Sequence, residues 1–181
     1  NITISRSKFS IEYPASFMLV ASMNPCPCGF YNHPDKDCVC SAGVVQKYLN
    51  RISGPLLDRI DIHIEVVPVP FDKLSELRPA ESSEGVRYRV IRARKIQMER
   101  FRNSEGIHSN AQLTPALMRE HCHLSEEGNR MLKNAMEKIG LSARAYDRII
   151  KVSRTIADLE ESPAIEPHHL AEAIQYRSLD R

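Results

Sequence analysis

One segment of this chain, residues 17–23, constrains the fold more than any other. Its sequence, Phe-Met-Leu-Val-Ala-Ser-Met, is a nearly continuous apolar run, which is typical of a parallel strand buried on both faces of a sheet. Asn24 follows the run directly. Because open α/β sheets hold their ligands at the carboxyl ends of the strands, this pattern predicts that the Asn24 side chain lies at a ligand-binding edge.

The hydrophobic patterning predicts an α/β part followed by an α-helical part. The first part has a hairpin pattern at 2–5 and 9–13, a Pro/Gly/Cys-rich loop at 25–40, a short helix at 42–51 and a β-branched strand at 62–69. Helical periodicity marks 83–102, 114–121, 125–138, 142–159 and 167–176. The predicted fold class is therefore α/β plus α: a partial core with parallel strands at residues 1–70, then a helical bundle at residues 71–181.

Local signals set the ends of the predicted helices. Thr114 is a cap followed by Pro115, Ser125 precedes two glutamates, Gly140 closes a helix and Pro167 opens the last one. Within 142–159 the apolar residues recur with helical spacing and predict a core-facing side: Ile149, Ile150, Val152, Ile156, Ala157 and Leu159.

The composition favours a protein with its own core and without a membrane partner. The chain has 181 residues, of which 42% are hydrophobic. It holds no apolar run near the roughly 18 residues of a membrane span and no visible signal peptide, so we expect a cytoplasmic location. The first residue is Asn1, in a strand pattern, and we therefore expect a piece of a longer protein.

Four of the five cysteines form two close pairs, Cys26-Pro-Cys28 and Cys38-Val-Cys40. In a reducing compartment disulfides are disfavoured, and four thiolates can complete a tetrahedral structural zinc site. Free thiols and a redox pair are the alternatives, and His33 could replace one thiolate. A zinc ion here would fix the loop beside Asn24 without taking part in catalysis.

An arginine suited to contact a phosphate follows in residues 54–61, Gly-Pro-Leu-Leu-Asp-Arg-Ile-Asp. Arg59 follows an apolar pair and lies between two aspartates, so it can project from a rigid base. An ion pair of Arg59 with Asp58 or Asp61 is the alternative. The chain has no Gly-x-x-x-x-Gly-Lys-Ser/Thr loop and no apolar strand that ends in paired acids, so we do not expect it to hydrolyse ATP by itself.

Four stretches together resemble the AAA+ ATPases of the magnesium-chelatase-like group, most closely its bacterial ComM/YifB-type members. They are residues 3–6 (Thr-Ile-Ser-Arg), 17–29, 51–61 and 141–148 (Leu-Ser-Ala-Arg-Ala-Tyr-Asp-Arg). The resemblance covers almost the whole chain, and the combination of stretches is specific. It implies the C-terminal part of an AAA+ core, lacking the Walker A and Walker B motifs, followed by a helical lid.

The resemblance also implies roles for individual residues. Asn24 looks like the sensor-1 residue, whose amide orients the attacking water without a charge that competes with the metal. Arg59 looks like an arginine finger that reaches the ATP of a neighbouring subunit. Arg144 looks like sensor 2, an arginine that binds the nucleotide phosphates. Arg148, on the same helical face, and Arg154 are the fallback candidates.

A ring-forming motor is the function that the resemblance implies. It would be a homo-oligomer, a hexamer, that uses ATP and Mg²⁺ to act on DNA, for example in branch migration during natural transformation. The hairpin at residues 2–13 would contact DNA through Arg6 and Lys8, unless its turn is simply solvated. Two alternatives stay open: a magnesium-chelatase-like subunit that remodels a partner protein, and a zinc-stabilised nucleic-acid-binding module.

Overall fold

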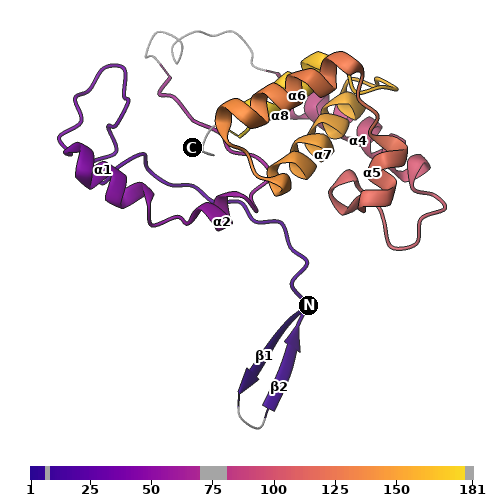
Figure 1. The fold of residues 1–181 in the computed structure, drawn as a ribbon, viewed down its shortest axis with the longest axis horizontal. Helices are drawn as coiled ribbons and strands as arrows, with labels where there is room; N and C mark the ends of the chain where they lie inside the picture. The colour runs from indigo at the N-terminus through magenta and orange to yellow at the C-terminus, as the bar shows by residue number, and fades with distance from the viewer. Residues whose placement is uncertain (7–8, 70–80, 178–181) are drawn as a thin grey trace. The chain divides into compact units, whose positions relative to one another are not determined.

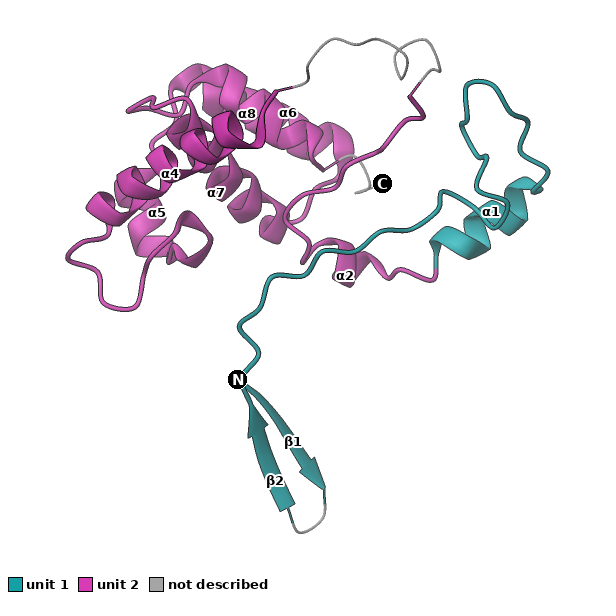
Figure 2. Ribbon diagram, turned by 180° about the vertical axis from the view of Figure 1, so that it is seen from behind, with its two compact units in different colours: residues 1–50 teal, residues 51–181 magenta. Residues whose placement is uncertain are grey.

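The computed structural model describes residues 1–6, 9–69 and 81–177 of this chain (Figure 1). These residues form two compact units, residues 1–50 and residues 51–181 (Figure 2). The domain boundary predicted at residue 70 and the predicted DNA contact Lys8 both lie outside the described residues. Among the described residues, no helix has the length and apolar character needed to cross a membrane.

The first unit contains the predicted hairpin and the predicted short helix. Strand β1 (Ile2–Arg6) pairs antiparallel with β2 (Phe9–Tyr13), in a register that sets Ile2 opposite Tyr13 and Arg6 opposite Phe9. The hydroxyls of Ser5 and Ser10, which face each other across the pair, lie 3.0 Å apart. Helix α1 (Ala42–Leu49) follows the cysteine-rich loop. Both strands and the helix are confirmed.

The predicted parallel strands are not confirmed. Residues 17–23 and 62–69 form no strand and pair with none in the described part of the chain, where β1 and β2 make the sheet. Their apolar side chains are largely exposed, with Met18 at 88% and Val66 at 86%. An apolar run of this kind becomes a central strand only when neighbouring strands bond to both of its edges. The described residues supply no such neighbours.

The second unit is helical, and the helices predicted after residue 80 lie within it. Its elements are α2 (Gly54–Leu57), α4 (Ser83–Arg100), the 3₁₀ turn η1 (Asn110–Gln112), α5 (Pro115–His121), α6 (Glu126–Ile139), α7 (Ala143–Leu159) and α8 (Pro167–Gln175). The sequence prediction missed the single turn of α2, which is too short to show a helical period. The five longer helices after residue 80 are confirmed.

Side-chain caps explain where these helices begin. Thr114 accepts a hydrogen bond from the Leu117 amide at 3.4 Å, and Ser125 accepts one from the Gly128 amide at 3.1 Å. The Ser142 hydroxyl accepts from the amide of Ala145 in the same way, at 3.2 Å, at the start of α7. Each cap satisfies one of the amides that the first helical turn leaves without a partner.

The hydrophobic core of the second unit surrounds α7, which packs against α4 and α8. Ile149, Ile150, Ile156 and Ala157 are buried, which confirms most of the predicted core face. Leu159 is 38% exposed, and this part of the prediction was wrong because Leu159 is the last residue of the helix. The same core cluster holds residues from α6 and α8 and from the ends of α4 and η1: Leu132, Leu170, Ala173, Phe101 and Leu113.

Candidate functional site

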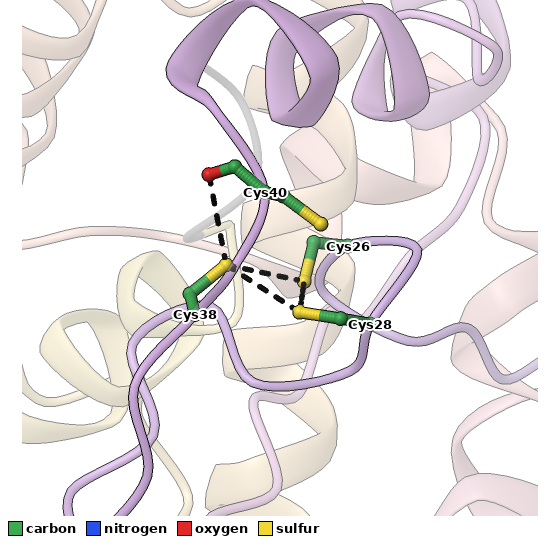
Figure 3. A group of neighbouring side chains, drawn as sticks. All are labelled: Cys26, Cys28, Cys38 and Cys40. Atoms are coloured by element: carbon green, nitrogen blue, oxygen red, sulfur yellow. Dashed lines mark hydrogen bonds between the residues drawn. The ribbon is translucent and has the colours of Figure 1, made fainter.

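The four paired cysteines lie together at the two ends of the 25–40 loop (Figure 3). Their sulfur atoms all lie within 4.8 Å of one another. The Sγ atom of Cys26 is 3.3 Å from that of Cys28 and 3.7 Å from that of Cys38. Bonded sulfurs would be about 2.05 Å apart, so the cysteines are free thiols. In a tetrahedral zinc site with zinc–sulfur bonds of about 2.3 Å, the sulfurs stand about 3.8 Å apart, close to the separations seen here.

The turn between Cys26 and Gly29 brings the first pair into position. The amide of Gly29 donates to the carbonyl of Cys26 at 3.0 Å. Gly29 has a φ of +82°, in the left-handed region that glycine adopts without strain.

His33, considered as a replacement ligand, does not belong to the sulfur group. Its Nδ1 accepts the Asp35 amide at 3.0 Å.

The environment of Cys28 favours the charged form of its thiol. A hydrogen bond from the backbone of Phe30 lowers the pKa of Cys28 to about 6, and contacts with Cys26 and the backbone of Val39 act in the same direction. A thiolate, not a thiol, is the form that binds a metal. The loop therefore presents the Cys28 sulfur in its metal-binding state near neutral pH, whereas burial and the neighbouring sulfurs of Cys28 and Cys26 raise the pKa of Cys38 and Cys40.

Asn24 lies beside the same turn. Its side chain is exposed, and a methyl group added at Gly29 would lie 3.9 Å from its Nδ2 atom. The turn that follows Cys26 therefore folds back toward the Asn24 amide.

Arg59 follows α2 and is exposed. Its Nη1 atom donates to the carbonyl of Pro55 at 2.6 Å, one turn earlier in the chain. Among the described residues it forms no ion pair with Asp58 or Asp61, so the alternative of a local salt bridge is not supported. Asp61 instead accepts a hydrogen bond from Arg148 on α7.

The three arginines considered on α7 have different surroundings. Arg144 lies in the first turn of α7, is exposed, and forms no hydrogen bond or ion pair within the described part of the chain. Arg148 is partly exposed and bound to Asp61. Arg154 is 2% exposed and donates to Asp158, to Ser162 and to Pro163. Arg154 therefore stabilises the fold, and its donors are not available to a nucleotide.

A second group of metal-type side chains, Glu160, His168 and His169, lies where α7 meets α8. The Glu160 carboxylate is 2.9 Å from Nε2 of His168 and 3.0 Å from Nε2 of His169. The Nδ1 atom of His169 accepts the Glu166 amide at 2.9 Å, so the proton of the neutral ring is on Nε2 and is donated to Glu160. A protonated nitrogen cannot bind a metal. We interpret this group as a hydrogen-bonded helix junction.

Arg177 is a structural residue that was not predicted from the sequence. Arg177 is 1% exposed and donates to the carbonyls of Ile60 and Leu57 on the Arg59 loop. It lies beyond the last predicted helix, and no local pattern distinguishes it from a surface arginine. Asp61 lies two residues after Arg59 in the sequence, but Arg148, with which it forms an ion pair, is distant in sequence. The sequence therefore did not predict this pair.

The predicted DNA contact Arg6 is exposed at the end of β1. Both faces of the hairpin are exposed, including the apolar side chains of Ile4, Phe9 and Ile11. A hairpin without a covered face has its stabilising surface free for a partner.

Comparison with known proteins identifies relatives along the whole chain. The family described as "Magnesium chelatase, subunit ChlI" matches residues 1–74, and "Magnesium chelatase, subunit ChlI C-terminal" matches residues 80–177. Competence protein ComM of Haemophilus influenzae is 44% identical over 181 residues, which cover 99% of this chain and 34% of ComM. The uncharacterized protein YifB of Escherichia coli is 42% identical over 183 residues, with the same coverage of 99% and 34%.

A more distant relative is an uncharacterized protein of Mycobacterium tuberculosis. It is 35% identical over 167 residues, which cover 91% of this chain and 32% of that protein. The chain thus spans about a third of the length of the relatives it matches, at 34%, 34% and 32%.

Proposed function

This chain belongs to the magnesium chelatase ChlI family, as a ComM/YifB-type member, and from this premise we propose that it is the C-terminal portion of a ring-forming AAA+ ATPase that acts on DNA. The competence role in the name of the Haemophilus influenzae relative supports DNA as the substrate. The phosphate-binding loop and the magnesium ligands would come from outside this chain, whose sequence holds neither.

The observation that carries the proposal is the exposed Arg59 guanidinium, which forms no ion pair with the aspartates beside it in the described structure. Within the described part of the chain its one hydrogen bond goes to the Pro55 carbonyl, so its other donors stay available for a phosphate. We assign to Arg59 the role of an arginine finger in the nucleotide site of a neighbouring subunit. There its fixed donors would stabilise the charge that develops on the transferred phosphate.

Arg144 and Arg148 are our candidates for binding the phosphates of ATP in their own subunit. Arg144 is an exposed cation in the first turn of α7, where the free amides of the helix also favour an anion. Arg148 lies one turn further along, and its bond to the exposed carboxylate of Asp61 is weak enough to exchange for a phosphate. Bound ATP and Mg²⁺ would supply the reacting phosphate and neutralise its charge.

Asn24 is our candidate for orienting the attacking water. An amide both donates and accepts, so it can hold a water between two polar groups. We propose that the four cysteines hold a structural zinc ion that stiffens the loop beside Asn24. The sulfur separations of 3.3 to 3.7 Å among Cys26, Cys28 and Cys38, with the Cys40 sulfur within 4.8 Å of all three, support this role. Four protein ligands leave no open position for catalysis by the metal.

The test is ATP turnover by the full-length protein, with and without branched DNA. We expect DNA to stimulate turnover, and we expect Arg59→Ala to lower the turnover rate by a factor of about 10³ or more. Arg130→Ala is the matched control, because Arg130 is an exposed arginine on α6 with no role in the proposal. Turnover that depends on Arg59 but ignores DNA would instead favour the magnesium-chelatase-like alternative, the remodelling of a partner protein.

Two other outcomes would count against the proposal. Turnover that is unchanged in Arg59→Ala would remove the finger assignment. Absence of any turnover, with DNA binding retained, would favour the zinc-stabilised nucleic-acid-binding module. In that case neutralising Arg6 and Lys8 should weaken binding at low salt, because each phosphate contact adds to the salt-dependent affinity.

A further inference from the structure

The loop that carries Arg59 is bound to the C-terminal end of α8 in the same chain. The Arg177 guanidinium, which is almost fully buried, donates from Nη1 to the Ile60 carbonyl and from Nη2 to the Leu57 carbonyl, the latter at 3.4 Å. These two carbonyls lie on either side of Arg59 in the sequence. One planar group with fixed donors therefore holds the backbone before and after Arg59.

Two further contacts bind the residues that follow Arg59. The amide of His63 donates to the carbonyl of Tyr176 at 2.8 Å. The carboxylate of Asp61 accepts from Nη1 of Arg148 on α7. Helix α2 is a single turn, and a helix of that length is not stable by itself. The position of Arg59 therefore depends on contacts made by α7 and by the end of α8.

We propose that Arg177 is a positioning residue for Arg59, and that Arg148 and Asp61 form a second, releasable link between the same loop and α7. This inference rests on the proposed role of Arg59 as an arginine finger. Arg177 keeps the backbone around Arg59 fixed, so that the exposed guanidinium reaches one place in the neighbouring nucleotide site. A misplacement of about 1 Å at a reacting group costs on the order of 100-fold in rate.

The Arg148–Asp61 link differs from the Arg177 contact in its exposure. The two side chains are 27% and 56% exposed, and an ion pair that water reaches is weaker and exchanges more readily than a buried one. Arg148 lies one turn after Arg144, so a phosphate bound at the start of α7 attracts both guanidinium groups. When Arg148 turns to the phosphate, Asp61 is released. Nucleotide binding in one subunit thereby changes the freedom of the finger that serves the next subunit.

The experiment measures kcat and KM for ATP in the full-length protein with three variants. Arg177→Ala should lower kcat by about 100-fold and leave KM unchanged, because Arg177 does not contact the nucleotide of its own subunit. Arg177→Lys should recover only part of the rate, since an ammonium group lacks the planar fork that bonds both carbonyls. Asp61→Asn, at an exposed position, should lower kcat less than Arg177→Ala and leave the melting temperature unchanged.

A double variant separates positioning from a general structural role. If Arg177 acts through Arg59, then Arg177→Ala has no further effect in an Arg59→Ala background. An equal loss of rate in both backgrounds, together with a lower melting temperature, would overturn the inference.

Where Arg177→Ala does not fold, the same comparison uses Arg177→Lys and Asp61→Asn. If Arg59→Ala impairs turnover but both of these variants are normal, this inference fails and the proposed function stands. If Arg59→Ala is itself active, the proposed function fails.

Discussion

Arg154 and Asp158, one turn apart on α7, form an ion pair that is almost sealed from solvent. Nε of Arg154 lies 3.1 Å from Oδ1 of Asp158, and the two side chains are 2% and 0% exposed. Asp158 also accepts hydrogen bonds from Arg100 on α4 and, at 2.8 Å, from Asn110 in η1. A single carboxylate thus joins three elements of the helical unit. This is why Arg154, despite its place on α7, is not available to a nucleotide.

Asp158→Asn is expected to destabilise the helical unit by about 3 kcal/mol, because it leaves the buried guanidinium of Arg154 and the partly buried one of Arg100, 14% exposed, without their carboxylate. Urea unfolding of the chain, followed by far-UV circular dichroism, measures the change. Glu99→Gln is the control, since Glu99 pairs with Arg102 at the surface, where both side chains are at least 70% exposed. Equal stability of the two variants would show that Asp158 does not hold these elements together.

Two glycines of α6 should respond in opposite ways to alanine. Gly140 closes the helix at a φ of +71°, where a side chain adds strain, so Gly140→Ala should cost about 1 kcal/mol. Gly128 lies inside the helix, and an added methyl would meet Leu124 and Ser125 at an ordinary 3.5 Å. Gly128→Ala should therefore leave stability unchanged or raise it by less than about 1 kcal/mol. The same urea titration compares the two variants. Equal effects on stability would contradict the claim that a side chain at position 140 strains the backbone.

The junction of α7 and α8 should weaken in acid. Hydrogen bonds from His168 and then His169 hold the pKa of Glu160 below its usual value of 4.5. Because the pKa is lower in the folded chain, the contribution of Glu160 is complete above the unfolded value and is lost as the pH falls through the folded one. We expect the melting temperature to fall below about pH 4.5 and Glu160→Gln to reduce that fall.

Glu137→Gln serves as the control for this acid dependence. Glu137 lies on α6 beside Lys133, 4.0 Å away, and both side chains are well exposed. Glu137→Gln changes the net charge of the chain by the same amount as Glu160→Gln, but it leaves the junction of α7 and α8 unchanged. Identical pH profiles for the two variants would assign the acid sensitivity to net charge instead of to Glu160.

The parts of this structure that could be predicted from sequence are the ones decided locally. Thr114, Ser125 and Ser142 cap their helices through amides three residues away, so the signal and the contact lie within one window of sequence. The cysteine cluster was predictable for a similar reason, because two short pairs need only one loop to bring them together.

The parts that could not be predicted depend on distant partners. The run at 17–23 has the pattern of a central strand, yet a strand needs neighbours that its own residues cannot supply. Arg177 contacts Ile60 and Leu57 across more than half of the chain, and its sequence context is that of a helix end. No window of local sequence contains both members of such a pair.

Removing one cysteine should abolish zinc binding. We expect about one zinc ion per chain in protein purified without added metal, and its loss in Cys28→Ser, because three thiolates do not complete the tetrahedral site. A chelator should lower the melting temperature of the parent chain but not that of the variant. Cys122→Ala is the matched control: Cys122 is a buried thiol in the helical core, outside the cluster, so its loss should leave the zinc content unchanged. Well under one equivalent in the parent chain, with no rise in melting temperature on adding zinc, would show that the cluster is a set of free thiols.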